Sequence, residues 1–219
     1  MADPRFAVVG FPRWRVLRPR LPRFVGGLLC LGAGLALTVD ARLGVSPFDV
    51  LHQGIARRTG LSFGTVVVVV GMVILLLWIP LRQPFGVGTV VNTLTVGFLI
   101  DGALWLLPEP AGLAARWPML VAGVVVTGLG MGLYIGAGLG PGPRDGLMTS
   151  IAARGHRLWV VRTIIEMTAL VSGWVLGGNV GVGTVIFAFG IGPVGHFFLD
   201  RFHLGVPAGT DLGPGVSAE

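Results

Sequence analysis

Six long apolar segments constrain this chain more than any other feature of its sequence. They lie at about residues 24–39, 62–80, 88–107, 118–139, 158–178 and 182–199. Each is close to the roughly 20 residues that cross the hydrocarbon core of a bilayer as an α-helix. Only 12% of the residues are charged, which is too few to cover the surface of an ordinary soluble domain. We therefore predict an all-α polytopic membrane protein.

Two shorter and more polar helical stretches interrupt this series, at Pro47–Arg58 and Pro143–Arg154. Both are too short to span a bilayer comfortably. If they re-enter the membrane, the chain has about six long transmembrane helices and two short ones. If they cross it, the chain has eight spans. The distribution of arginines fits both topologies, so the sequence leaves the choice open.

The chain also matches itself. A shift of 96 positions aligns residues 32–58 with 128–154, and twelve of the 27 aligned residues are identical, including Pro47 with Pro143 and Asp49 with Asp145. A shift of 95 then aligns GVGTV at 86–90 with GVGTV at 181–185. We predict one membrane domain over 24–200, built from two repeats at about 24–107 and 118–200. Six spans would make the repeats antiparallel, and eight would make them parallel.

The two ends of the chain differ from this domain. Residues 1–23 carry six arginines and one acid, as is typical of a segment that stays in the cytoplasm. We predict a multi-pass protein of the bacterial cytoplasmic (inner) membrane with a cytoplasmic N-terminus, and we prefer this topological role to nucleic-acid binding. Residues 201–219 have little to bury and are predicted to be disordered.

The starts of the two short stretches are the most informative local feature. Ser46-Pro47-Phe48-Asp49 and Gly142-Pro143-Arg144-Asp145 each place proline first in the helix and aspartate third, where a carboxylate accepts unpaired backbone N–H groups. The plain interpretation is helix capping. The functional hypothesis is that two broken helices meet near the middle of the membrane and frame a solute site, as in transporters with duplicated halves. Because the aspartates offset the positive helix ends, such a site would favour neutral or cationic groups over anions.

Polar side chains inside apolar segments are costly and therefore suggest function. The candidates for substrate binding, together with the helix starts, are Ser46, Pro47, Asp49, His52, Pro143, Asp145, Asn92, Asp101 and His196. Asp101 and His196 occupy matching repeat positions, where they could pass on a proton or simply face the headgroups. Arg162 and Glu166 are four residues apart on one helical face and are predicted to form an ion pair, either structural or part of a gate.

Glycines at every fourth position, Gly128, Gly132, Gly136 and Gly140, allow close helix contacts. We favour packing inside the chain, with a homodimer seam as the alternative. The GxGxxG pattern at Gly190, Gly192 and Gly195 lies inside an apolar segment, so it does not predict a dinucleotide site. The sequence contains no recognisable catalytic or metal-binding motif and one cysteine, Cys30. We expect a protein that is not an enzyme and has no cofactor or metal.

The stretch LGVSPFDVLHQGIARRTGLSFGTV, from Leu43 to Val66, and its echo GLGPGPRDGLMTSIAAR resemble the YczE/YyaS/YitT group of bacterial integral membrane proteins. The resemblance covers about residues 25–200 and implies a polytopic inner-membrane protein. It carries no settled activity and no accepted binding residues.

The duplication, the short helices and the intramembrane polar residues together suggest a secondary carrier or facilitator of an unknown small solute, with membrane lipid as its surroundings. The alternative is a non-transporting scaffold or accessory protein that binds a partner.

Overall fold

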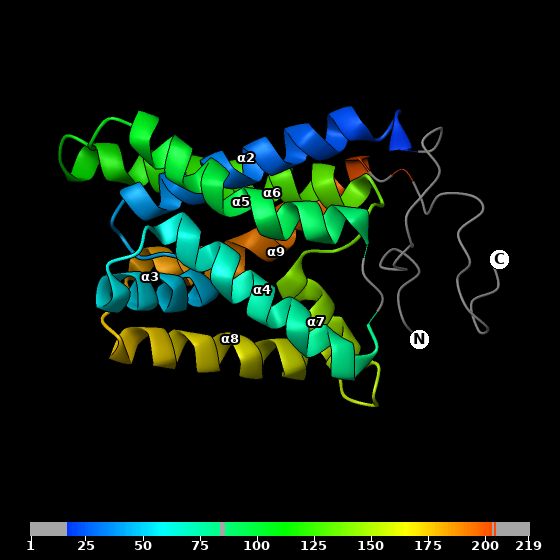
Figure 1. Ribbon diagram of the computed structural model, residues 1–219. Coiled ribbons are helices and arrows are strands. Elements are labelled where there is room, and N and C mark those ends of the chain that lie inside the picture. The colour runs from blue at the N-terminus through cyan, green and yellow to red at the C-terminus, as the bar shows by residue number, and fades with distance from the viewer. Residues whose placement is uncertain (1–16, 84–85, 203, 205–219) are drawn as a thin grey trace.

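The computed structural model describes residues 17–83, 86–202 and 204, and this part of the chain is helical without any strand (Figure 1). Six long helices are α2 (Leu21–Asp40), α4 (Phe63–Leu81), α5 (Val87–Leu106), α6 (Leu113–Gly136), α8 (Leu158–Val175) and α9 (Val182–Phe202). Two short helices are α3 (Pro47–Thr59) and α7 (Pro143–Ala152). The predicted basic segment up to residue 16 and the predicted disordered tail from 205 lie outside the described residues.

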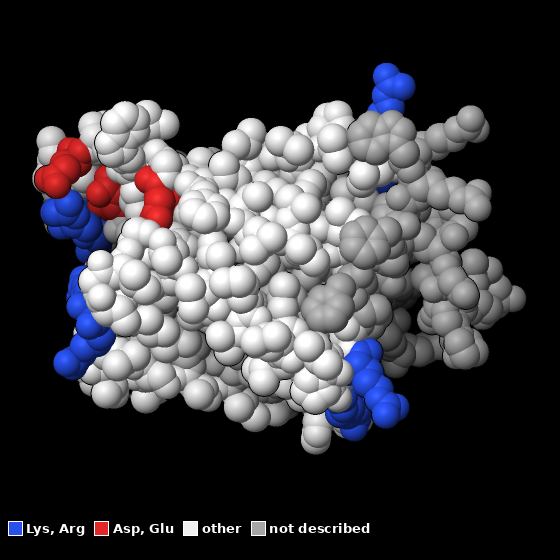
Figure 2. Space-filling view, viewed as in Figure 1, with Lys and Arg blue, Asp and Glu red and all other residues white. Residues whose placement is uncertain are grey.

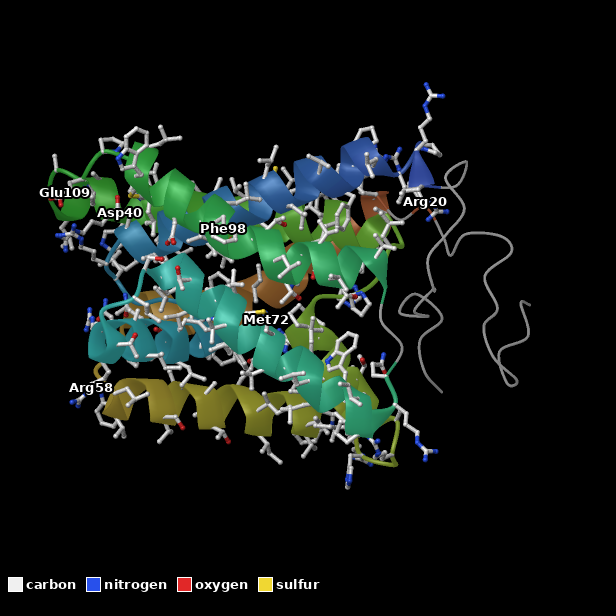
Figure 3. The ribbon with its side chains drawn as sticks, viewed as in Figure 1. Arg20, Asp40, Arg58, Met72, Phe98 and Glu109 are labelled. Atoms are coloured by element: carbon white, nitrogen blue, oxygen red, sulfur yellow. The ribbon has the colours of Figure 1, made fainter. Side chains whose placement is uncertain are left out.

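All six long helices have the length and hydropathy of membrane spans. On the face drawn in Figure 2, the charged side chains of the described residues gather toward the two ends of the bundle, and the area between them is uncharged. Arg20 lies at one end, and Asp40, Arg58 and Glu109 lie at the other (Figure 3). Large apolar side chains point outward between the ends, as shown by Phe98, which is 65% exposed. The prediction of a polytopic helical membrane protein is confirmed.

The short helices do not cross the bundle. Helix α3 starts inside and returns to the end at which α2 finishes, and α7 returns to the opposite end, at which α6 finishes (Figure 1). Thr59 and Gly155, which follow the two short helices, therefore lie at opposite ends. Each short helix is preceded by a glycine in the left-handed region, Gly44 with φ 111° and Gly140 with φ 124°, which turns the chain back inward. The described part of the chain thus has six candidate spans, and α3 and α7 are not among them, which favours the prediction of six spans over eight.

Helix α6 is shifted from its prediction, since it begins at Leu113 and ends at Gly136. It ends early because Gly138 and Gly140 have positive φ, which the α-helix does not permit.

Helices α2 and α6 make the most extensive helix–helix contact of the bundle and run antiparallel. Gly27 lies against Gly130 and Tyr134, and Gly34 lies against Gly123 and Thr127. A Cβ added to Gly27 or Gly34 would meet backbone atoms of α6 closer than 3.0 Å. Small residues at a helix crossing allow this close approach.

Several contacts occur twice, at positions related by the sequence shift. The N–H of Gly88 donates to the carbonyl of Leu139, and the N–H of Gly183 donates to that of Leu43, both at 2.8 Å. A second matched pair joins the C-terminus of each short helix to a long helix: Arg58 donates to the carbonyl of Leu176, and Arg154 donates to that of Leu81.

The match is incomplete, because α4 packs along α5 whereas α8 has no comparable contact with α9. Matched crossed contacts and antiparallel equivalent helices are what an inverted repeat would produce. The two-fold repeat itself stays a sequence-based prediction.

The glycine stripe of α6 is used inside the chain. A Cβ on Gly128 would meet Val194 of α9, and one on Gly132 would meet Phe198 and Leu199 of the same helix. Internal packing of Gly128 and Gly132 is thus observed, and a homodimer through the four glycines stays a prediction.

Candidate functional site

The starts of α3 and α7 meet in the interior of the bundle. The guanidinium carbon of Arg144 lies 5.6 Å from the centroid of the Phe48 ring, and these two residues occupy matching positions in the sequence repeat. The buried Trp78 of α4 donates its indole N–H to the carbonyl of Pro143 at 3.1 Å. The structure thus brings together Pro47 and Pro143, the two predicted helix starts, at one place.

The start of α3 carries a compact buried network. The Ser46 hydroxyl donates to Asp49 Oδ2 at 2.5 Å, and the Asp49 N–H donates back to Ser46 Oγ at 3.2 Å. Nδ1 of His52 lies 3.0 Å from Asp49 Oδ1. All three residues are at most 7% exposed, and the His52 ring meets the edges of Phe48 and Phe63. Both carboxylate oxygens of Asp49 therefore have a partner from α3 itself or from its N-cap.

The start of α7 is built differently, because Gly142 has no side chain with which to cap the helix. A hydroxyl comes from α6 instead: Tyr134 Oη donates to Asp145 Oδ2 at 3.3 Å. A Cβ on Gly142 would lie 2.9 Å from that phenol oxygen, so glycine leaves the space that Tyr134 occupies. The two helix starts are thus chemically unequal.

Arg144 links the two helix starts electrostatically. Burial opposes its positive charge, whereas the carboxylates of Asp145, Asp49 and Glu166, which come from α7, α3 and α8, favour it. Glu166 is also paired with Arg162 on its own helix, with Oε1 3.0 Å from Nε. This is the ion pair that the four-residue spacing predicted. The site therefore combines three acids with two arginines and one histidine.

Two predicted residues lie elsewhere and do not come together. Asp101 caps α4 from α5, because its carboxylate accepts the N–H of Gly64 at 2.7 Å and the hydroxyl of Ser62 at 2.5 Å. His196 is exposed on α9. An inverted repeat places equivalent residues toward opposite ends, so matching sequence positions did not mean proximity. The separate positions of Asp101 and His196 favour structural roles for both residues over a proton relay between them.

Asn92 of α5 is buried, at 6% exposure. Its side-chain N–H2 group has no hydrogen-bond partner among the described residues. Nor do three or more His, Cys, Asp or Glu side chains of the described part come close enough together to hold a metal ion.

Sequence reasoning did not select Tyr134, Trp78 or Arg144 as site residues. Tyr134 is the single tyrosine of the chain and lies within the glycine stripe, where only that isolation could have marked it. Arg144 was visible as a charge in place of the equivalent Phe48. That both residues face Asp145 was decided by the approach of α6 and α7.

Comparison with known proteins assigns the chain to a family. A family described as "Family of unknown function (DUF6198)" matches residues 19–200. The chain belongs to this family. It is 35% identical over 198 residues to an uncharacterised protein of Haemophilus influenzae, covering 90% of this chain and 91% of the relative.

Two Bacillus subtilis relatives confirm the resemblance seen in the sequence. The uncharacterised membrane protein YczE is 32% identical over 81% of this chain and 84% of its own length. The uncharacterised protein YyaS is 28% identical over 79% of this chain and 89% of its own. No solved structure matches the chain. The relatives therefore support a membrane protein, and the chemistry of the site has to be inferred from the residues of this chain.

Proposed function

We propose that this DUF6198 protein is a secondary carrier or facilitator of a small solute, with its site where α3 and α7 start. One observation carries the proposal: two short helices begin side by side within the bundle and hold charges of both signs there. Charged residues within a membrane bundle are costly and usually mark a ligand or ion path. Discontinuous helices whose ends point at a central ligand are a recurring design of secondary carriers.

A purely structural role explains the cap of α3 but not the charge at Arg144. Capping accounts for Ser46 and Asp49, whose bonds are satisfied within α3. It does not account for Arg144, since an apolar residue serves at the matching position, Phe48. Nothing among the described residues of the site resembles a nucleophile with its base, so the proposed activity is movement of a solute and not a chemical reaction.

The arginines support an orientation in a bacterial cytoplasmic membrane. Figure 3 labels Arg20 at one end and Arg58 at the other. By the order of the helix ends, the arginines at 18, 23, 82, 154, 157 and 201 belong to the Arg20 end, and those at 42, 57 and 116 belong to the Arg58 end. Since basic residues are enriched on the cytoplasmic side, the N-terminal end faces the cytoplasm in this proposal.

Transport can be tested with a mixture of candidate solutes. Proteoliposomes containing the purified protein are loaded with a mixture of bacterial metabolites, and mass spectrometry follows which compounds leave. We expect at least one compound to leave faster from wild-type vesicles than from protein-free vesicles, and to be retained by Asp145→Asn. Asp200→Asn, on α9 at the membrane surface, is the control that should keep wild-type efflux.

Folded, correctly inserted protein with no protein-dependent efflux of any compound would refute the carrier proposal. Stoichiometric co-purification of another protein under those circumstances would instead favour the scaffold alternative.

A further inference from the structure

We propose that the site takes a compact zwitterion, with Arg144 binding the anionic group and Asp145 the cationic group. This inference rests on the proposed function and names the class of its solute. It changes the expectation from sequence, in which the two aspartates alone favoured neutral or cationic groups. The difference comes from the place of Arg144, which the fold brings into contact with both helix starts.

Two of the three acids around Arg144 already have partners of their own. Asp49 accepts from Ser46 with one carboxylate oxygen and lies 3.0 Å from the His52 ring nitrogen with the other. Glu166 is paired with Arg162 at 3.0 Å. A ligand would have to displace these bonds in order to use either carboxylate. Asp49 and Glu166 therefore belong to the wall of the site.

Arg144 and Asp145 are left with unused hydrogen-bonding capacity. Within the described part of the chain, no hydrogen bond to the Arg144 guanidinium is found, although it carries five N–H donors. Its central carbon lies over the Phe48 ring, 5.6 Å from the centroid. Among the same residues, Asp145 is bonded through one carboxylate oxygen only, by a long contact of 3.3 Å from Tyr134. Both side chains are partly buried, so these donors and acceptors are available inside the bundle.

The two groups with unused bonding capacity decide the class of ligand. Arg144 and Asp145 carry opposite charges and follow each other at the start of α7. A simple anion would bond Arg144 and leave Asp145 without a partner, and a simple cation would do the reverse; a buried charged group without a partner is expensive. A zwitterion bonds both groups. A guanidinium also matches a carboxylate or phosphate group with two parallel N–H bonds.

The unequal repeats imply one such site in each chain. The position equivalent to Arg144 is Phe48, whose ring holds the guanidinium by a cation–π contact. The first repeat therefore has no arginine of its own with which to bind a second anionic group. One zwitterion per chain is the expected stoichiometry.

The test measures binding and not transport. Wild-type protein, purified in detergent free of phosphatidylethanolamine, is titrated with each of the twenty standard amino acids and with glycerophosphoethanolamine, and its melting temperature is followed. The best binder is then compared with its amide, which is cationic, and its N-acetyl derivative, which is anionic. We expect both derivatives to bind at least tenfold more weakly than the parent zwitterion.

Variants assign the two roles. Arg144→Gln should weaken the parent zwitterion at least tenfold, and Arg144→Lys should recover part of the loss. Because Arg144→Gln leaves acids unbalanced and could unfold the protein, the neutral double variant Arg144→Gln/Asp145→Asn is the second reagent. It should fold, give a single gel-filtration peak and bind none of the probes. Arg157→Gln, exposed at the start of α8, is the matched control and should bind as wild type does.

The outcomes show whether the zwitterion comes from water or from a lipid, and they distinguish failure of the zwitterion inference from failure of the carrier proposal. Binding of an amino acid points to a solute from water, and binding of glycerophosphoethanolamine alone points to a lipid headgroup; both support the zwitterion site. Binding of no zwitterion, an amide that binds as well as its parent, or unchanged binding in the double variant would overturn it. Protein-dependent efflux of a simple cation in the vesicle assay would then leave the carrier proposal standing while this inference fails.

Discussion

The buried N-cap of α3 gives a quantitative test of how much burial adds to the cost of losing a hydrogen bond. Ser46 is 1% exposed, accepts the Asp49 N–H at 3.2 Å and donates to Asp49 Oδ2 at 2.5 Å. Ser46→Ala removes both bonds. Loss of an N-cap costs about 1 kcal/mol, and a buried charged acceptor left without its partner costs roughly 1–3 kcal/mol more. We expect Ser46→Ala to lower the free energy of unfolding by about 2–4 kcal/mol.

The chain supplies a matched control in Ser62, the N-cap of α4. Ser62 accepts the Thr65 N–H at 3.2 Å and donates to Asp101 Oδ2 at 2.5 Å, the same two distances, but it is exposed at the end of the bundle. Water can replace its bond to the carboxylate, so Ser62→Ala should lose only the capping contribution of about 1 kcal/mol.

The assay is reversible unfolding of both variants in mixed micelles, followed by the loss of helical circular dichroism. The free energies come from linear extrapolation. Equal losses in the two variants, within about 0.5 kcal/mol, would refute the reasoning, because burial would then make no difference to the cost of the broken bond.

Two further predictions follow from the helix starts and the topology. Gly142→Ser gives α7 the serine cap that α3 has. It should nevertheless lower the melting temperature, because the new Cβ would lie 2.9 Å from Tyr134 Oη. Adding Tyr134→Phe should recover stability, and a Gly142→Ser variant more stable than wild type would contradict this packing. In a Cys30→Ser background, cysteines introduced as Thr59→Cys and Gly155→Cys should be labelled from opposite sides of the membrane, with Gly155→Cys reached from the cytoplasm. Labelling of both from one side would contradict six spans.

The sequence alone determined the class and the elements of this protein. Hydropathy marks helices because a bilayer requires every backbone group to be bonded within its own segment, so segment length and composition were sufficient. The starts of the short helices could also be read, since proline at the first helical position and a serine cap act locally at Pro47 and Ser46. The resemblance to the YczE/YyaS/YitT group was visible in the same motifs.

Only the tertiary structure decided the number of spans and the composition of the site. Whether α3 crosses the membrane or returns depends on the turn at Gly44, which packs against Gly181 and Thr184, and on the packing of α3 against α8. Both are contacts between segments far apart in the sequence. Asp101 and His196 looked equivalent in sequence, but the antiparallel arrangement sent them to different places. Arg144 became a site residue because α3 and α7, distant in sequence, approach each other there, and Tyr134 because the turn after α6 brings α7 back to it. A polar side chain acquires its role from the partners that burial gives it.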